Sequence, residues 1–144
     1  MPKSSLVNKA FIRILVFILV LISTVFVRVQ AQSKPWIAPA EAKNLKNPIP
    51  GDAISLKEGG AIYTANCTPC HGTKGRGDGP AAAALDPKPA DHTSAVMRSE
   101  TDGSLFYKIS EGRKPMPQYK TTFTEKQRWE LVNYIRTLNK TAKK

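Results

Sequence analysis

The chain of 144 residues has few of the side chains from which many protein sites are built. It holds only two cysteines and two histidines, and its 11 acidic residues are outnumbered by 22 lysines and arginines. Because Cys67 and Cys70 lie three positions apart, no disulfide within the chain can join distant segments. A basic run with interleaved aromatic residues is also lacking, which disfavours nucleic-acid binding. There is no visible internal repeat, and the length favours a single domain.

The N-terminus has the pattern of a secretory signal peptide. A basic start precedes the almost wholly apolar segment 14–27, and small residues lead to a cleavage point after Ala31. The alternative is an uncleaved membrane anchor, but this run is short for about 30 Å of hydrocarbon and Arg28 interrupts it. We therefore expect residues 1–31 to direct export and to be removed, with an N-terminal anchor as the alternative.

The charge left after cleavage bears on the kind of partner. Removal of residues 1–31 lowers the 22 cations to 18 against 11 acids, a formal charge of +7. An exported basic protein could meet anionic lipid, nucleic acid or an acidic protein surface. Docking to an acidic redox protein partner is the reading we favour, although scattered lysines more often make a merely solvated surface.

The rest of the chain divides into a lead and a compact domain. Segment 32–52 carries four prolines, so we expect an extended lead that lies against the domain, with Trp36 as its one large apolar anchor. Segment 53–144 forms the domain. No stretch alternates over strand length, and the predicted fold class is therefore all-α.

Three segments of this domain have helical patterns, at 54–67, 101–112 and 124–140. Each begins with a capping candidate, and the second stops at a glycine. These candidates are Ser55, Thr101, and the pair Thr124 and Gln127, with Gly112 as the stop. The glycine- and proline-rich stretch between the first two segments contains one short Ala-rich turn.

The stretch Cys67-Thr68-Pro69-Cys70-His71 is compatible with three chemistries. A redox dithiol requires its cysteines at a helix start, whereas here they end a helical segment and a glycine-rich loop follows. Zinc requires four ligands, and after the motif only His92 remains among the usual soft candidates. Covalent haem attachment requires two thiols followed at once by a histidine. The motif thus predicts one covalent haem c, attached through thioether bonds to Cys67 and Cys70, with His71 on the iron.

A haem would also resolve a packing problem. A domain of this size with three short helices has few apolar side chains with which to form a core, and small domains generally need an additional stabilising element. With no distant disulfide available, a flat apolar macrocycle tied to the chain would fill the interior.

The second axial position has three candidates, Met116, His92 and Met97. Met116 is favoured because Pro115 and Pro117 stiffen the backbone on both sides of it. His92 reads as a loop histidine near a haem propionate, and Met97 reads as ordinary packing.

The residues Gly59, Tyr63, the Cys67–His71 motif and the segment 131–134 together resemble the class I c-type cytochromes, small monohaem electron carriers of the bacterial periplasm. The resemblance spans about residues 53 to 140. It implies a cytochrome c fold in which the first and last helices cross closely. Gly59 and Tyr63 would then meet Leu131 and Tyr134.

The resemblance also implies a role for each site residue. His71 would be the proximal iron ligand and Met116 the distal one, and a proline carbonyl, best matched by Pro80, would accept a hydrogen bond from His71. His92 departs from the family because related sequences often have an apolar residue there. The implied function is electron transport in a respiratory chain, without enzymatic activity, in the periplasm. The alternatives are a haem subunit of a larger respiratory or dehydrogenase complex, or an open-site haem sensor.

Overall fold

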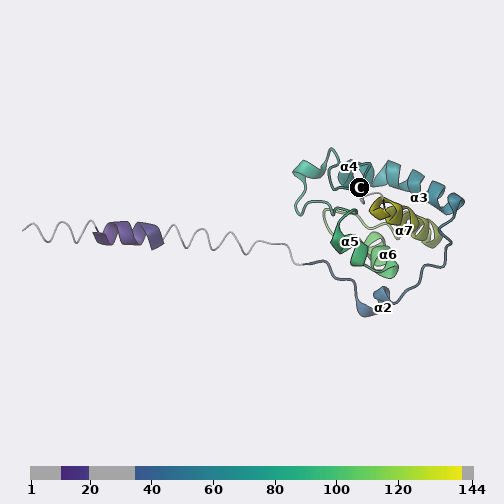
Figure 1. Cartoon of the computed structure of the whole chain (residues 1–144), viewed down its shortest axis with the longest axis horizontal. Coiled ribbons are helices and arrows are strands. Elements are labelled where there is room, and N and C mark those ends of the chain that lie inside the picture. Colours follow the sequence, from purple (N-terminus) through teal and green to yellow (C-terminus); the bar gives the residue numbers. More distant parts are fainter. Residues whose placement is uncertain (1–10, 20–34, 141–144) are drawn as a thin grey trace, which may run out of the picture. The chain divides into compact units, whose positions relative to one another are not determined.

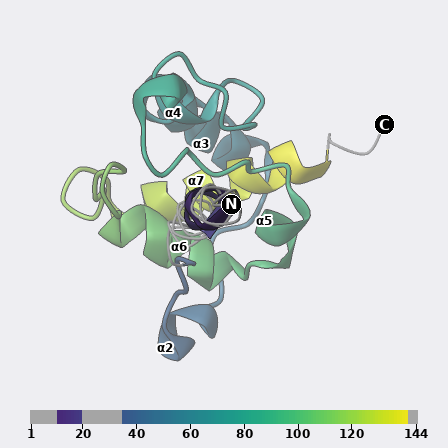
Figure 2. The same ribbon diagram turned by 90° about the vertical axis from the view of Figure 1, so that its left-hand side faces the viewer.

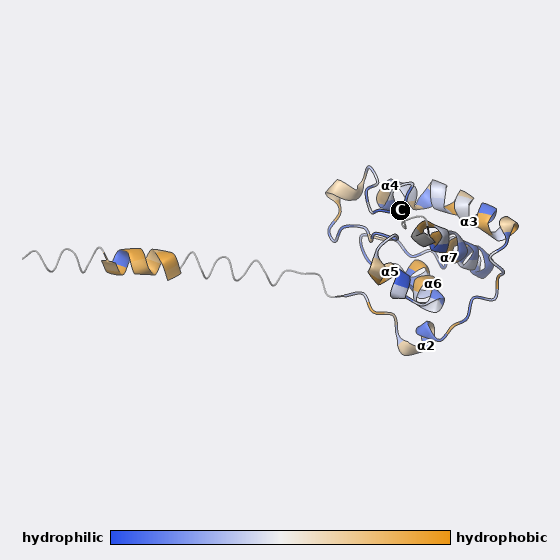
Figure 3. Ribbon diagram, viewed as in Figure 1, coloured by the Kyte–Doolittle hydropathy of each residue, from blue (hydrophilic) through white to orange (hydrophobic). Residues whose placement is uncertain are grey.

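The computed structural model describes residues 11–19 and 35–140, and it divides the chain into two units, Met1–Pro35 and Trp36–Lys144 (Figure 1). In the first unit, residues 11–19 form a mostly apolar helix with Arg13 as its one charged residue (Figure 3). Most of the predicted signal peptide, including its cleavage point, lies outside the described residues. Within the two described ranges, no helix has both the length and the apolar content that crossing a membrane requires.

The second unit is built from helices and loops (Figure 1). The described residues contain no strand, only an isolated bridge between Arg113 and Met116, so the all-α prediction is confirmed. The helices are α2 (Ala40–Lys43), α3 (Ala53–Asn66), α4 (Thr68–His71), α5 (Ala95–Ser99), α6 (Asp102–Glu111) and α7 (Glu125–Lys140), with a 3-10 turn η1 (Ala82–Ala84).

The three main helices begin and end close to the predicted positions. Thr101 caps α6, and Thr124 and Gln127 make the expected reciprocal pair before α7, with N···O distances of 2.9 and 3.2 Å. The predicted cap of α3 is wrong. Asp52 Oδ1 accepts the N–H of Ser55 at 2.8 Å, so Asp52 takes the role that had been expected of Ser55.

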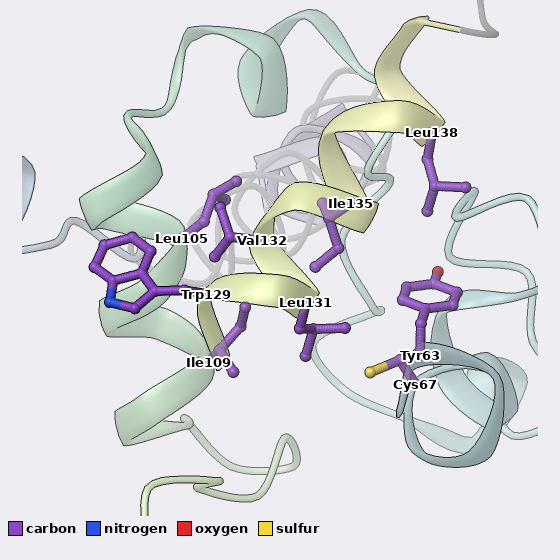
Figure 4. Packing of buried hydrophobic residues seen from close by; sticks show 9 residues of the cluster. All are labelled: Tyr63, Cys67, Leu105, Ile109, Trp129, Leu131, Val132, Ile135 and Leu138. Carbon is purple, nitrogen blue, oxygen red and sulfur yellow. The ribbon is translucent and has the colours of Figure 1, made fainter. Parts of the chain in front are cut away.

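The core lies on both sides of α7 (Figure 4). Trp129 and Val132 lie toward α6. On the other side of α7, Leu131 and Leu138 lie toward Tyr63 and Cys67 at the end of α3. The buried cluster consists of Tyr63, Cys67, Leu105, Ile109, Trp129, Leu131, Val132, Ile135 and Leu138. One helix therefore joins α3, which leads into the Cys67–His71 motif, to α6, which leads into the Met116 loop.

α3 and α7 approach each other at Gly59 and Gly60. A Cβ on Gly59 would lie 2.1 Å from the carbonyl oxygen of Glu130, so only glycine permits this contact between the two backbones. The ring of Tyr134 packs on Gly60 and lies 5.2 Å, centroid to centroid, from the ring of Tyr63. The close crossing that the family resemblance implied is thus present.

The lead, segment 35–52 of the described residues, packs on the helices of the domain. α2 lies beside α6 (Figure 2), where a Cβ on Gly103 would meet the carbonyl oxygen of Ala42 at 2.0 Å. Farther along, the Asn133 side chain of α7 donates to the carbonyl oxygen of Ile49 at 3.2 Å and accepts from Asn47 Nδ2 at 2.7 Å. These contacts hold the segment from α2 to α3 against the domain.

Candidate functional site

The Cys67–His71 motif forms one helical turn directly after α3. Cys67 is both the last cap of α3 and the first cap of α4. Its carbonyl oxygen accepts the N–H groups of Cys70 at 3.1 Å and of His71 at 2.8 Å. Both cysteines are free thiols; Cys67 is buried and Cys70 half-buried. The turn therefore presents two thiols and one imidazole within five residues.

The environment of Cys67 argues against thiolate chemistry. Burial raises the pKa of the Cys67 thiol to about 12, and the neighbouring Cys70 adds to the shift. A redox dithiol requires the opposite, a thiol whose pKa is lowered so that the thiolate is populated. Among the residues that the structure describes, no group of three or more His, Cys, Asp or Glu side chains could hold a metal ion, which also disfavours zinc.

His71 is held in a single tautomer by the backbone. Its Nδ1 lies 2.9 Å from the carbonyl oxygen of Ala90, and because a carbonyl only accepts, Nδ1 carries the hydrogen. Nε2 is then left with a lone pair. Burial lowers the pKa of His71, against the opposing effect of the Ala90 hydrogen bond, and so favours the neutral ring. The predicted acceptor, Pro80, is wrong: the long loop returns to His71 at Ala90.

His92 lies in a loop, as the sequence indicated, but its side chain is buried beside His71. It is 6% exposed, and its ring stacks on that of His71 with 4.3 Å between centroids and 17° between planes. Burial and the adjacent His71 lower the pKa of His92 to about 3. Its Nδ1 lies 3.4 Å from the hydroxyl oxygen of Tyr63, which itself donates to the carbonyl oxygen of Gly72 at 3.0 Å.

A tertiary contact explains why the sequence did not indicate that His92 lies beside His71. Its backbone N–H donates to the carbonyl oxygen of Gly75 at 2.6 Å, so the loop turns back on itself to bring His92 beside His71. The separation of 21 positions between the two histidines carries no periodicity that could indicate this contact. The one available signal was composition, since these are the only histidines in the chain.

Met116 lies in a tight loop after α6. Arg113 and Met116 exchange two backbone hydrogen bonds, with N···O distances of 3.0 and 2.9 Å, and the Lys114–Pro115 peptide bond is cis. Met116 is half-buried and is not part of the hydrophobic cluster. Met97, by contrast, packs against that cluster.

Comparison with known proteins bears on what this arrangement does. Residues 55–135 match the family model described as cytochrome c oxidase, cbb3-type, subunit III. The chain belongs to this family. As a cytochrome c domain it is a haem protein of electron transfer, and its family implies a covalently attached haem c.

A solved structure supports the fold of this cytochrome. A chain of a reducing HAO-like protein complex from Kuenenia stuttgartiensis matches it with a TM-score of 0.58 and 24% sequence identity. The match covers 76% of the cytochrome and 52% of that chain, so the cytochrome corresponds to about half of the matched chain. A search of the curated proteins finds no match.

The donor atoms of the cytochrome fit a c-type haem. Two uncombined thiols three positions apart suit two vinyl groups, and the adjacent imidazole offers an unprotonated Nε2. A structural zinc ion would require further ligands of the same kind beside them. The donor set on the Cys67–His71 turn therefore matches the cofactor that the family implies.

Proposed function

We propose that the cytochrome is a one-electron carrier whose haem is held by Cys67 and Cys70 and whose iron is ligated by His71 Nε2 and by the thioether sulfur of Met116. The observation that carries this proposal is the hydrogen bond from His71 Nδ1 to Ala90, because it leaves Nε2 free on a ring already locked in place. When bound, a haem c supplies reversible one-electron chemistry at its iron.

The residues contribute orientation and electronic tuning. The Ala90 hydrogen bond and the stacked His92 ring restrict rotation of His71. A thioether is a soft, neutral ligand that favours ferrous iron, so ligation by Met116 raises the reduction potential relative to a second histidine. The proposed role is that of a carrier, in line with the cytochrome c family, whose members typically transfer electrons.

A direct test of covalent attachment is intact-mass measurement of the native protein beside a denaturing gel stained for haem peroxidase activity. We expect one haem retained after denaturation, and the same mass reports whether residues 1–31 are absent. Recovery of the bare polypeptide, or of Cys67 and Cys70 joined to each other, would contradict the proposal.

Replacement of Met116 tests the distal ligand. Met116→Ala should lower the reduction potential and allow carbon monoxide or other small ligands to reach the ferrous iron, because the soft neutral ligand is removed. The wild-type protein should show the charge-transfer band of methionine bound to ferric iron, and the variant should lack it. Met97→Leu is the matched control and should leave both potential and band in place. An unchanged potential in Met116→Ala would favour an open-site haem sensor.

We also propose export to the periplasm and docking to acidic redox partners. Lys74, Arg76, Lys114 and Lys120 are exposed, and Lys120 forms an ion pair with Glu111 at 2.8 Å. If these cations orient a partner, the rate of electron transfer should fall as ionic strength rises. A rate indifferent to salt would exclude steering by charge.

A second candidate is a haem subunit within a larger assembly, since the matched Kuenenia stuttgartiensis chain belongs to a protein complex. Co-purification from native membranes or periplasm separates the two: a free carrier elutes alone, and a subunit elutes with its complex.

A further inference from the structure

We propose that the lead positions the distal ligand: Trp36 packs against the base of the Met116 loop and keeps that loop closed over the site. This inference rests on the proposed ligation by Met116. Trp36 is the first residue of the second unit, and it precedes the matched family region, which begins at residue 55. The lead is therefore an addition outside the part of the chain that the family describes.

The first observation is a pair of cation contacts on the indole ring. The Cζ of Arg113 lies 5.0 Å from the centroid of the Trp36 ring, and the Nζ of Lys108 lies 5.9 Å from it. Both distances are within the range of a cation–π attraction, for which tryptophan is the best aromatic partner. Lys108 belongs to the last turn of α6, and Arg113 begins the loop that follows it. Trp36 thus contacts both the helix and the loop that leaves it.

The second observation connects Arg113 to Met116. Their two reciprocal backbone hydrogen bonds close a four-residue loop, so the positions of the two residues are coupled. Before this loop, Gly112 has a φ of 63° and packs so tightly that a Cβ would lie 2.5 Å from the backbone nitrogen of Gln118. The loop is therefore held at both ends, and a contact on Arg113 acts on the residue that presents the thioether.

The third observation is that the lead is itself anchored close to Trp36. Ala38 and Ala42 are buried, at 2% and 5% exposure, and the carbonyl oxygen of Lys43 accepts a hydrogen bond from Thr101 Oγ1 at 3.0 Å. α2 is pressed against Gly103 of α6. Because these contacts lie within seven residues of Trp36, its indole is tethered to the same helix that carries the Met116 loop.

Together these contacts oppose detachment of Met116. Release of the thioether requires the loop to move, and such movement separates Arg113 from Trp36. A cation–π contact at a partly exposed site changes an equilibrium by roughly two- to five-fold. Only the Arg113 contact lies on the loop, so loss of the indole should increase the fraction of protein with a detached methionine by about that factor.

The test uses the full-length ferric holoprotein and imidazole as a competing ligand for the position of Met116. The methionine charge-transfer band reports displacement during the titration. Trp36→Ala should bind imidazole about two- to five-fold more tightly than wild type. Trp36→Phe, which keeps an aromatic face, should have an imidazole affinity close to that of wild type. Ile37→Ala is the matched control, since Ile37 is 69% exposed in the same lead, and it should match wild type.

A second control separates positioning from general loosening. Asn133→Ala removes side-chain hydrogen bonds from α7 to the later part of the lead and to the start of α3 without touching Trp36, and it should lower the denaturation midpoint with little effect on imidazole affinity. Equal imidazole affinity in Trp36→Ala and Ile37→Ala overturns the inference, as does an equal increase in Asn133→Ala. If the wild-type band is present and disappears in Met116→Ala, such a result leaves the proposed function standing. A wild-type protein without the band overturns both.

Discussion

Tyr63 connects the residues around His71 through a single hydroxyl group. The phenol is almost fully buried, and burial, followed by the nearby Cys67, raises the pKa of Tyr63, so the hydroxyl keeps its hydrogen. That hydrogen is donated to the carbonyl oxygen of Gly72, which lies closer than His92 Nδ1. His92 must then donate its own Nδ1–H to the phenol oxygen. The Tyr63 hydroxyl thus provides hydrogen-bond partners for two buried groups, the carbonyl oxygen of Gly72 and Nδ1 of His92.

A double-mutant cycle tests this arrangement. Tyr63→Phe should lower the free energy of unfolding by about 1–3 kcal/mol, because both partners lose a hydrogen bond in a buried place. In a His92→Leu background the same change should be less destabilising, since only the Gly72 carbonyl then loses a partner. Denaturant unfolding of the four holoproteins measures the coupling. Equal losses in both backgrounds would show that Tyr63 and His92 do not interact.

The site residues differ in how far the sequence could predict them. Cys67, Cys70 and His71 are adjacent in the chain, so local spacing brings them together on one turn. The acceptor of the His71 hydrogen bond and the partner of its ring come from a loop 19 to 21 positions away, whose path depends on backbone hydrogen bonds between loop segments. Such contacts leave no periodic trace in the sequence, so the family resemblance alone pointed to a proline carbonyl, Pro80, and not to Ala90.

At the scale of elements, the long helices and the short Ala-rich turn η1 were predictable, whereas α2 and α5 were not. An apolar stripe, together with side chains that cap the first turn, predicts both α6 and α7. α2 and α5 have only 4 and 5 residues, too few for a pattern. Their shape depends on what they pack against, as α2 does against Gly103. Local signals therefore predict the long helices, whereas tertiary contacts decide where short helices such as α2 and α5 form.

The crossing of α3 and α7 makes a prediction at this scale. Gly59→Ala places a methyl group 2.1 Å from the carbonyl oxygen of Glu130, and since backbone cannot swing away, the helices must separate. We expect a loss of about 1–3 kcal/mol or more in the free energy of unfolding, measured by denaturant titration.

Gly60→Ala is the matched control for this crossing. The two positions are adjacent in α3 and gain the same intrinsic helix propensity from alanine. At Gly60 the nearest atom is in the ring of Tyr134, 3.0 Å away, and a side chain can shift by the few tenths of an ångström required. Similar stabilities for the two variants would mean that the helices do not cross as closely as described.

At the scale of the whole molecule, α7 connects α3, which leads into the Cys67–His71 turn, to α6, which leads into the Met116 loop. Its two faces pack against α6, which leads to Met116, and against Tyr63 and Cys67 at the end of α3 (Figure 4). Among the residues that the structure describes, the buried cluster has nine members, a small core for a unit with long loops. Under the proposed function, a haem tied to Cys67 and Cys70 would add apolar volume to this small core, and the fold would then depend on the cofactor.

Removal of both thiols tests this dependence. In Cys67→Ala/Cys70→Ala the covalent haem should be absent, and the remaining core should be too small to hold the chain folded, so we expect circular dichroism to show little helix and urea to produce no cooperative transition. Met116→Ala is the control, because it keeps both thioether bonds and should remain folded with haem. A haem-free double variant that unfolds cooperatively would mean that the helices alone stabilise the domain, and the cofactor would then be needed for electron transfer but not for the fold.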